Sequence, residues 1–140
     1  MRFEFFDAED IRRLAVDMIA ELELYHIDPE RLICFRSRGS KSRGTIARIY
    51  ALSRIWQKAL KLPSYYALEV ISERYDKLDE AEKEKIIIHE LLHIPHSFKG
   101  GFRHHKGYVT NKRIEQLFKQ LTEKRRLRTG DGQGVTNGRT

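Results

Sequence analysis

The chain has 140 residues, which is enough for one domain with a real hydrophobic core and too few for two domains of ordinary size. Hydrophobic residues make up 40% and charged residues 34%, so we expect residues 1–128 to fold as one domain, whereas residues 129–140 lack apolar periodicity and predict a disordered tail. The formal net charge of +7 favours acidic partners such as nucleic acid, but a basic cluster at residues 124–128 is equally typical of a solvated helix end.

Cysteine content and hydropathy indicate the compartment. Cys34 is the only cysteine, which excludes an intramolecular disulfide, and its position inside an apolar run predicts a core residue. No stretch approaches the roughly 18 apolar residues of a membrane span, and residues 1–13 lack the apolar segment of a signal peptide. We therefore expect a soluble, cytoplasmic protein with no membrane partner, and the sequence predicts no particular oligomeric state.

The first half of the chain predicts a helix followed by two strands. Asp7 is expected to cap a helix that ends near Tyr25, because apolar residues recur between them at helical spacing. Branched and aromatic residues predict strands at residues 31–37 and 45–52. Residues 36–44 between them are rich in Gly, Ser and basic residues, so we expect the two strands to form a hairpin with a basic loop.

The second half predicts a short helix at residues 53–60, a third strand at 65–73 and two longer helices. Asp79 is a good N-cap, with Glu82 completing a capping-box pattern, and the helix it starts should run to about Ile94, before Pro95. Its apolar residues surround most of the helix, which predicts a central position. Thr110 should cap the last helix. This order of elements indicates an α+β fold.

A possible metal site lies in the predicted central helix. His89, Glu90 and His93 form an H-E-x-x-H motif, and residues four apart on a helix face the same way, so both imidazoles can reach one ion. Burying these polar groups on an apolar helix would be costly without a partner. We expect one Zn²⁺ per chain, held by His89 and His93, with Glu90 as the catalytic general base acting on zinc-bound water.

A catalytic zinc needs a third protein ligand, and the sequence offers four candidates. His96 follows the same helix end, from which three ligands cannot surround an ion tetrahedrally. His104 and His105 lie beyond a Gly-Gly loop that could fold back over the helix, and neighbouring loop side chains point different ways, so only one of the two should bind. Glu115, on the last helix, has the spacing of a downstream glutamate ligand, although an exposed helix glutamate is the commoner case.

Residues 31–121 resemble a known family. HELLHIP at 89–95, FKGGFRHHKG at 98–107 and ALEVISERYDKL at 67–78 are similar to the small archaeal and phage metallopeptidases, which are relatives of the SprT-like zincins. The resemblance implies a minimal zincin: an N-terminal helix, a sheet of about three strands, the H-E-x-x-H helix beneath it and a C-terminal helix. The family pattern R-x-H-K-G favours His105 as the third ligand, with His104 as the alternative.

The resemblance also implies a mode of substrate binding. In zincins the strand before the metal helix lies at the sheet edge over the cleft and pairs with extended substrate, which makes residues 66–72 the candidate strand. A fully paired strand with no substrate role fits the same pattern. Pattern does not separate these two possibilities.

Two functional hypotheses from different classes follow. The first is a zinc metallopeptidase that hydrolyses peptide bonds in a peptide or protein substrate. The second is a basic, nucleic-acid-associated zinc-binding protein whose zinc is structural or whose catalysis is vestigial, including a role in processing proteins attached to DNA. In the second case, the basic side chains of loop 36–44 would contact phosphates. These side chains are Arg36, Arg38, Lys41 and Arg43.

Overall fold

The computed structural model describes residues 2–103 and 107–129, which form a mixed α+β fold. The strands are β1 (Glu4–Asp7), β2 (Leu32–Arg38), β3 (Ala47–Ala51) and β4 (Tyr66–Ile71). The helices are α1 (Glu9–Glu21), α2 (Arg54–Leu60), α3 (Ser72–Tyr75), α4 (Glu80–Leu92) and α5 (Asn111–Thr129), with a 3-10 turn, η1, at Pro29–Arg31.

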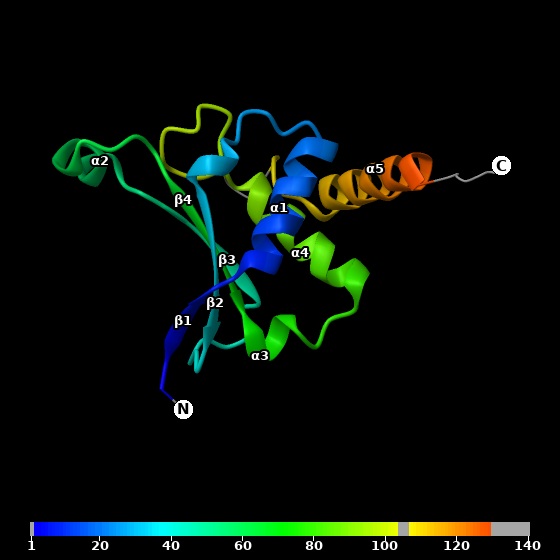
Figure 1. Cartoon of the computed structure of the whole chain (residues 1–140), viewed down its shortest axis with the longest axis horizontal. Helices are drawn as coiled ribbons and strands as arrows, with labels where there is room; N and C mark the ends of the chain where they lie inside the picture. The colour runs from blue at the N-terminus through cyan, green and yellow to red at the C-terminus, as the bar shows by residue number, and fades with distance from the viewer. Residues whose placement is uncertain (1, 104–106, 130–140) are drawn as a thin grey trace.

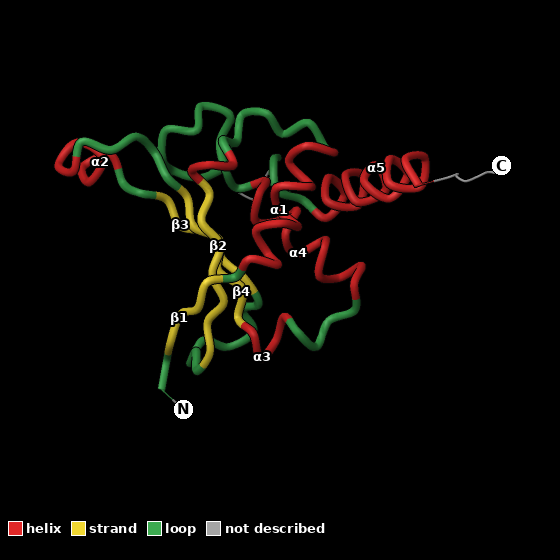
Figure 2. Tube along the Cα trace, in the orientation of Figure 1, coloured by secondary structure: helices red, strands yellow, loops and turns green. Residues whose placement is uncertain are grey.

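The sheet has the strand order β1-β2-β4-β3, with β2 and β4 parallel and the two outer pairs antiparallel. Helices α1, α4 and α5 gather on one side of this sheet (Figure 1). α2, in the connection between β3 and β4, projects away from these three helices. Figure 2 shows the resulting two layers, with strands on one side and the three long helices on the other. Side chains of β2 and β4 alternate between the helix layer and the open face of the sheet, as strand geometry requires.

The predicted hairpin is wrong, because β2 and β3 do not pair with each other. β4 lies between them, parallel to β2 from the pair Leu32–Tyr66 onward and antiparallel to β3. β4 is therefore paired on both sides, so of the two possibilities for residues 66–72 the structure shows the fully paired strand and not the sheet-edge strand. The prediction assumed that strands adjacent in the sequence pair with each other, which is the commoner case. Here β2 and β3 each pair with β4, which is more distant in the sequence. The strand was expected to continue to residue 73, but it ends at Ile71, and α3 begins at the next residue, Ser72.

The N-terminal segment also differs from expectation. Residues before the first helix form the short strand β1, which pairs with β2 and gives the sheet four strands instead of about three. Asp7 ends this strand, and Ala8 takes the N-cap position without a side-chain cap. α1 ends at Glu21, four residues before Tyr25, because Glu23 turns into the left-handed region with φ of 55°. The Leu24 N–H then bonds the Ile19 carbonyl, as in a Schellman motif.

The hydrophobic core lies between the sheet and the helices, and α4 crosses its centre. Ile87 and Ile88 are fully buried and Leu91 is nearly so, and they pack among buried residues of α1, β2 and β4, including Cys34 as predicted. Truncating one of the buried α4 side chains to Ala would cost about 2–5 kcal/mol, because the close-packed surroundings relax only in part. The core therefore fixes the position of α4, and with it the motif on that helix.

α5 packs against α4 and completes the helix layer. Thr110 caps it as predicted, through a 3.1 Å hydrogen bond from the Arg113 N–H to the Thr110 Oγ1. The helix includes Thr129, and residues 130–140 of the predicted tail lie outside the described residues. None of the helices within residues 2–103 and 107–129 combines the length and apolar character that a membrane span requires.

Candidate metal centre

α4 presents the H-E-x-x-H motif on its last turn. Its start is set as predicted, because Asp79 is the N-cap and its carboxylate accepts a 2.8 Å hydrogen bond from the Glu82 N–H. The helix ends at Leu92, and His93 is its C-cap. The ring centroids of His89 and His93 lie 5.2 Å apart. The two imidazoles are therefore neighbours on one side of a helix that the core holds in place.

The His93 ring is held by the chain that follows the helix. Its Nδ1 lies 2.8 Å from the carbonyl oxygen of Arg103, and the Arg103 N–H donates a 2.8 Å hydrogen bond back to the His93 carbonyl. A carbonyl oxygen can only accept, so Nδ1 carries the proton when the imidazole is neutral. Nε2 is then the nitrogen with the lone pair. Metal-binding histidines are commonly oriented in this way by a backbone carbonyl.

Glu90 is the buried member of the motif. Only 8% of the residue is exposed, and its Oε2 lies 4.0 Å from His89 Nε2, beyond hydrogen-bonding distance. Desolvation by burial raises the pKa of Glu90 to about 7. A cation held by the neighbouring imidazoles would favour the ionised form and lower this pKa. The site thus places a buried carboxyl beside two imidazoles, an arrangement suited to moving protons near neutral pH.

Two of the four proposed third ligands have other contacts. His96 stacks on His26 with ring centroids 4.3 Å apart, and Glu115 pairs with Lys85 at 3.0 Å. The remaining candidates, His104 and His105, lie outside the described residues. Within residues 2–103 and 107–129 no three His, Cys, Asp or Glu side chains form a metal-binding group. The described part therefore brings together two of the predicted ligands, His89 and His93, whose imidazoles are of a donor type that zinc commonly binds.

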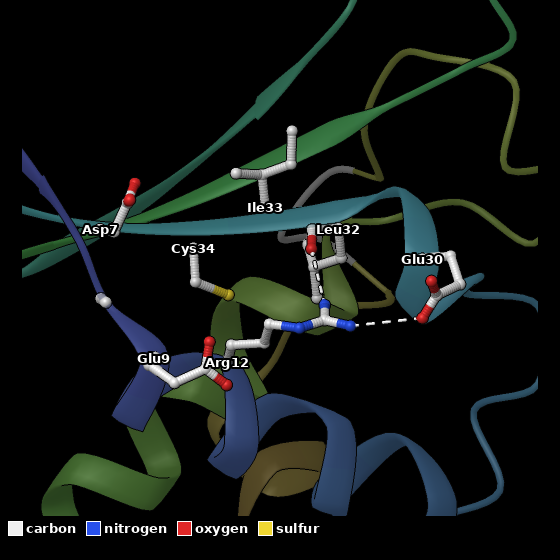
Figure 3. A pocket seen from close by; sticks show the side chains of 8 residues that line it. Asp7, Glu9, Arg12, Glu30, Leu32, Ile33 and Cys34 are labelled. Atoms are coloured by element: carbon white, nitrogen blue, oxygen red, sulfur yellow. Dashed lines mark hydrogen bonds and ion pairs between the residues drawn. The ribbon is translucent and has the colours of Figure 1, made fainter.

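A cavity of about 300 Å³ lies away from this site, between β2 and the start of α1 (Figure 3). Arg12 donates hydrogen bonds to the carbonyls of Pro29 and Leu32 and contacts Glu30 at 3.4 Å. Cys34 also lines the cavity, and burial raises the pKa of its thiol to about 12. A thiol with this pKa is protonated at neutral pH, so Cys34 has the properties of a core residue and not of a nucleophile.

The basic loop is less available for phosphates than the sequence suggested. Arg36 lies in β2 and forms two ion pairs, with Asp10 at 2.7 Å and with Asp76 at 2.6 Å. The acidic Glu73 accepts a 2.8 Å hydrogen bond from the Gly39 N–H and so lies against the loop. Carboxylates thus offset part of the positive charge. The structure does not favour the nucleic-acid hypothesis.

The contacts that orient His93 could not be predicted from the sequence. Its partner is the backbone carbonyl of Arg103, and every residue type carries such a carbonyl, so composition and spacing contain no signal for it. The side chains that hold this part of the chain, including Tyr66, resembled ordinary strand residues in the sequence. Their role depends on contacts more than thirty residues apart.

Comparison with known proteins identifies the family. Residues 3–126 match the model of the family described as "Putative phage metallopeptidase". The chain belongs to this family. The match spans every described strand and all but the last turn of α5, so it covers both imidazoles and Glu90. No curated protein and no solved structure matches the chain.

Proposed function

We propose that this member of the metallopeptidase family is a zinc-dependent peptidase of the zincin type, with Glu90 as its general base. The observation that carries the proposal is the pairing of His89 and His93 beside a buried carboxyl, with His93 Nδ1 committed to the Arg103 carbonyl at 2.8 Å. Because this bond keeps the proton on Nδ1, the lone pair of Nε2 is the one that can bind zinc. Family membership supports the same activity.

We further propose that His105 is the third ligand, with His104 as the alternative. Both lie outside the described residues, and the proposal rests on the R-x-H-K-G pattern formed by residues 103–107. The described chain supports it in one respect, because Arg103, which directly precedes His104 in the sequence, is hydrogen-bonded to His93. The Lys85 contact of Glu115 makes the glutamate a weaker candidate.

Bound zinc would polarise the peptide carbonyl and acidify a water molecule. With zinc held by His89 and His93, the Glu90 carboxylate would accept a proton from a water molecule that attacks the carbonyl carbon, and would then return this proton to the nitrogen of the leaving amine. The C–N bond breaks and a carboxylic acid and an amine are released. Burial of Glu90 serves this cycle, because desolvation raises the pKa of its carboxyl and so opposes the lowering of this pKa by the cation, which keeps the carboxylate basic enough to accept a proton.

The substrate would bind as an added strand on β3, the true sheet edge near α4. The Ile71 N–H donates to the Ile46 carbonyl, and the Leu52 N–H donates to the Tyr65 carbonyl. These pairs fix the alternation of the antiparallel ladder, so the backbone groups of Ala47, Ile49 and Ala51 face away from β4. An extended peptide can pair with these groups, a mode that recognises backbone more than side chains.

Zinc content and catalysis can be tested together. We expect purified protein to contain one zinc per chain and to cleave a denatured protein, and we expect Glu90→Gln to retain the zinc and lose cleavage. His105→Ala and His104→Ala, compared for zinc affinity, identify the third ligand, because only the true ligand should cause a large loss. Metal-free protein after expression with zinc would contradict the proposal.

A further inference from the structure

The segment Phe98–Arg103 has no regular secondary structure, yet side chains from distant parts of the chain bind its backbone. Loop backbone groups usually bond to water or to one another, and each buried group needs a partner. Here consecutive groups are bonded to the β3–β4 connection and to the first residue of β4. These bonds hold the loop in one position up to Arg103, which contacts His93.

Tyr66 makes the central contacts of this arrangement. Its hydroxyl accepts a 3.1 Å hydrogen bond from the Gly100 N–H and donates a 3.0 Å hydrogen bond to the Gly101 carbonyl. The residue is 1% exposed, and its ring lies 5.0 Å from that of Phe98. Because β4 is hydrogen-bonded to a strand on each side, the backbone of Tyr66 is held firmly in the sheet. One hydroxyl therefore fixes both residues of the Gly-Gly turn.

Two further side chains bind the adjacent carbonyls. Ser64 Oγ donates to the Phe98 carbonyl, and Gln57 Nε2 donates to the Lys99 carbonyl at 2.9 Å. The turn approaches the connection closely, since a Cβ added to Gly100, which has φ of +110°, would lie 3.1 Å from Gln57 Nε2. The positive φ therefore favours glycine at Gly100, and a side chain there would also press against Gln57. These contacts support the same placement of the loop.

The loop contacts the motif through Arg103. Two residues beyond Gly101, Arg103 exchanges two 2.8 Å hydrogen bonds with His93, one to the backbone and one to the ring. We propose that the Tyr66 hydroxyl, through the Gly100–Gly101 turn and the Arg103 carbonyl, holds the His93 imidazole in the tautomer that presents Nε2 to a metal. Tyr66 is thus a positioning residue. The metal-binding part of this inference rests on the proposed function, whereas the tautomer part concerns the metal-free chain.

Tyr66→Phe tests the inference, because it removes the hydroxyl and keeps the ring. Tyr75→Phe is the matched control: Tyr75 is similarly buried at 2%, but its hydroxyl donates to the Lys83 carbonyl at 3.5 Å instead of to this loop. In the metal-free proteins, nitrogen NMR of the His93 ring reports which of its two nitrogens carries the proton, and therefore the tautomer. Competition with a chelator reports zinc affinity.

We expect Tyr66→Phe to lower the population of the Nδ1–H tautomer and to weaken zinc binding about 10-fold, the usual effect of losing a group that orients a ligand. Tyr75→Phe should leave both measurements unchanged. An unaltered tautomer and affinity in folded Tyr66→Phe would overturn the inference, as would equal losses in both variants. A changed tautomer in a chain whose wild type binds no zinc would support the positioning role and contradict the proposed peptidase.

Gln57→Ala provides a second test that does not alter a core residue. It removes the 2.9 Å bond to the Lys99 carbonyl and leaves Tyr66 in place. We expect the same direction of change in tautomer and affinity, with a smaller magnitude than for Tyr66→Phe. This variant serves if Tyr66→Phe does not fold, and an unchanged His93 tautomer in Gln57→Ala would then overturn the inference.

Discussion

Two buried glutamates in this protein have opposite surroundings. Glu69, in the central strand β4, is 1% exposed and receives hydrogen bonds from the hydroxyls of Ser37 and Tyr50 as well as an ion pair from Arg48 at 3.1 Å. Glu90 is 8% exposed, and burial alone raises its pKa to about 7. A buried carboxylate surrounded by donors is a structural element, whereas one that is only desolvated remains available for proton transfer.

Glu90→Gln tests the catalytic side of this comparison and should have the largest effect. Removing a general base typically lowers the rate by 10²- to 10⁴-fold, so we expect a loss of this size in kcat against a denatured protein. Zinc content should not change, because Glu90 is not a proposed ligand. Equal activity in the variant and the wild type would show that Glu90 does not act as the base.

Glu69→Gln tests the structural side with the same change in chemistry. Removing one partner of a buried pair leaves the other uncompensated, and Arg48, whose side chain is 38% exposed, recovers part of the loss through water. We expect the free energy of unfolding to fall by about 1–3 kcal/mol in urea denaturation. Zinc affinity should stay at the wild-type value. If Glu69→Gln instead abolished zinc binding, the two carboxylates would not have separate roles.

Cys34 extends the comparison to a third buried acid, with a sign that can be tested by pH. Its thiol has an ordinary pKa of 9.0 and a folded value of about 12, so the fold disfavours the thiolate. The contribution of the Cys34 thiol to the free energy of unfolding is therefore fully present below about pH 9. This contribution is lost as the pH rises toward about 12, and the loss is about 1 kcal/mol at about pH 10. Cys34→Ala should lack this decrease. Parallel unfolding curves at about pH 8 and pH 10 provide the measurement.

Tyr50→Phe should have the smallest effect. It removes the hydroxyl that donates to Glu69, but the residue is 42% exposed and water can take its place. We expect a loss of about 0.5–1 kcal/mol in the free energy of unfolding. When Tyr50→Phe is combined with Glu69→Gln, we expect the two losses not to add, because the two side chains are in contact. A double-mutant cycle measures this coupling, and strict additivity would mean that the hydroxyl does not stabilise Glu69.

The local elements and the motif could be predicted from the sequence because each depends on nearby residues. The cap at Asp79, the central α4 and the cap at Thr110 follow from side chains within one or two turns, and the structure confirms them. The order of the strands could not be predicted in this way, because the position of β4 between β2 and β3 depends on pairing between segments far apart.

The site shows the same division. His89, Glu90 and His93 were visible as a helical pattern, whereas the bond from His93 to Arg103 uses a backbone carbonyl. The early end of α1 at Glu21 arises from a left-handed Glu23, a conformation that sequence alone rarely indicates for glutamate. The identity of the third ligand stays a prediction, since both histidines that the family pattern favours lie outside the described residues.

The open edge of β3 has a second consequence, for behaviour at high concentration. Backbone groups at Ala47, Ile49 and Ala51 that can accept a substrate strand can equally accept a strand from another copy of the chain. Natural edges are often protected by charge, and the charged side chain of β3, Arg48, is engaged in an ion pair with Glu69. A peptide bound at this edge, as we propose for the substrate, would therefore also block pairing between copies of the chain, because both use the same row of hydrogen-bonding groups.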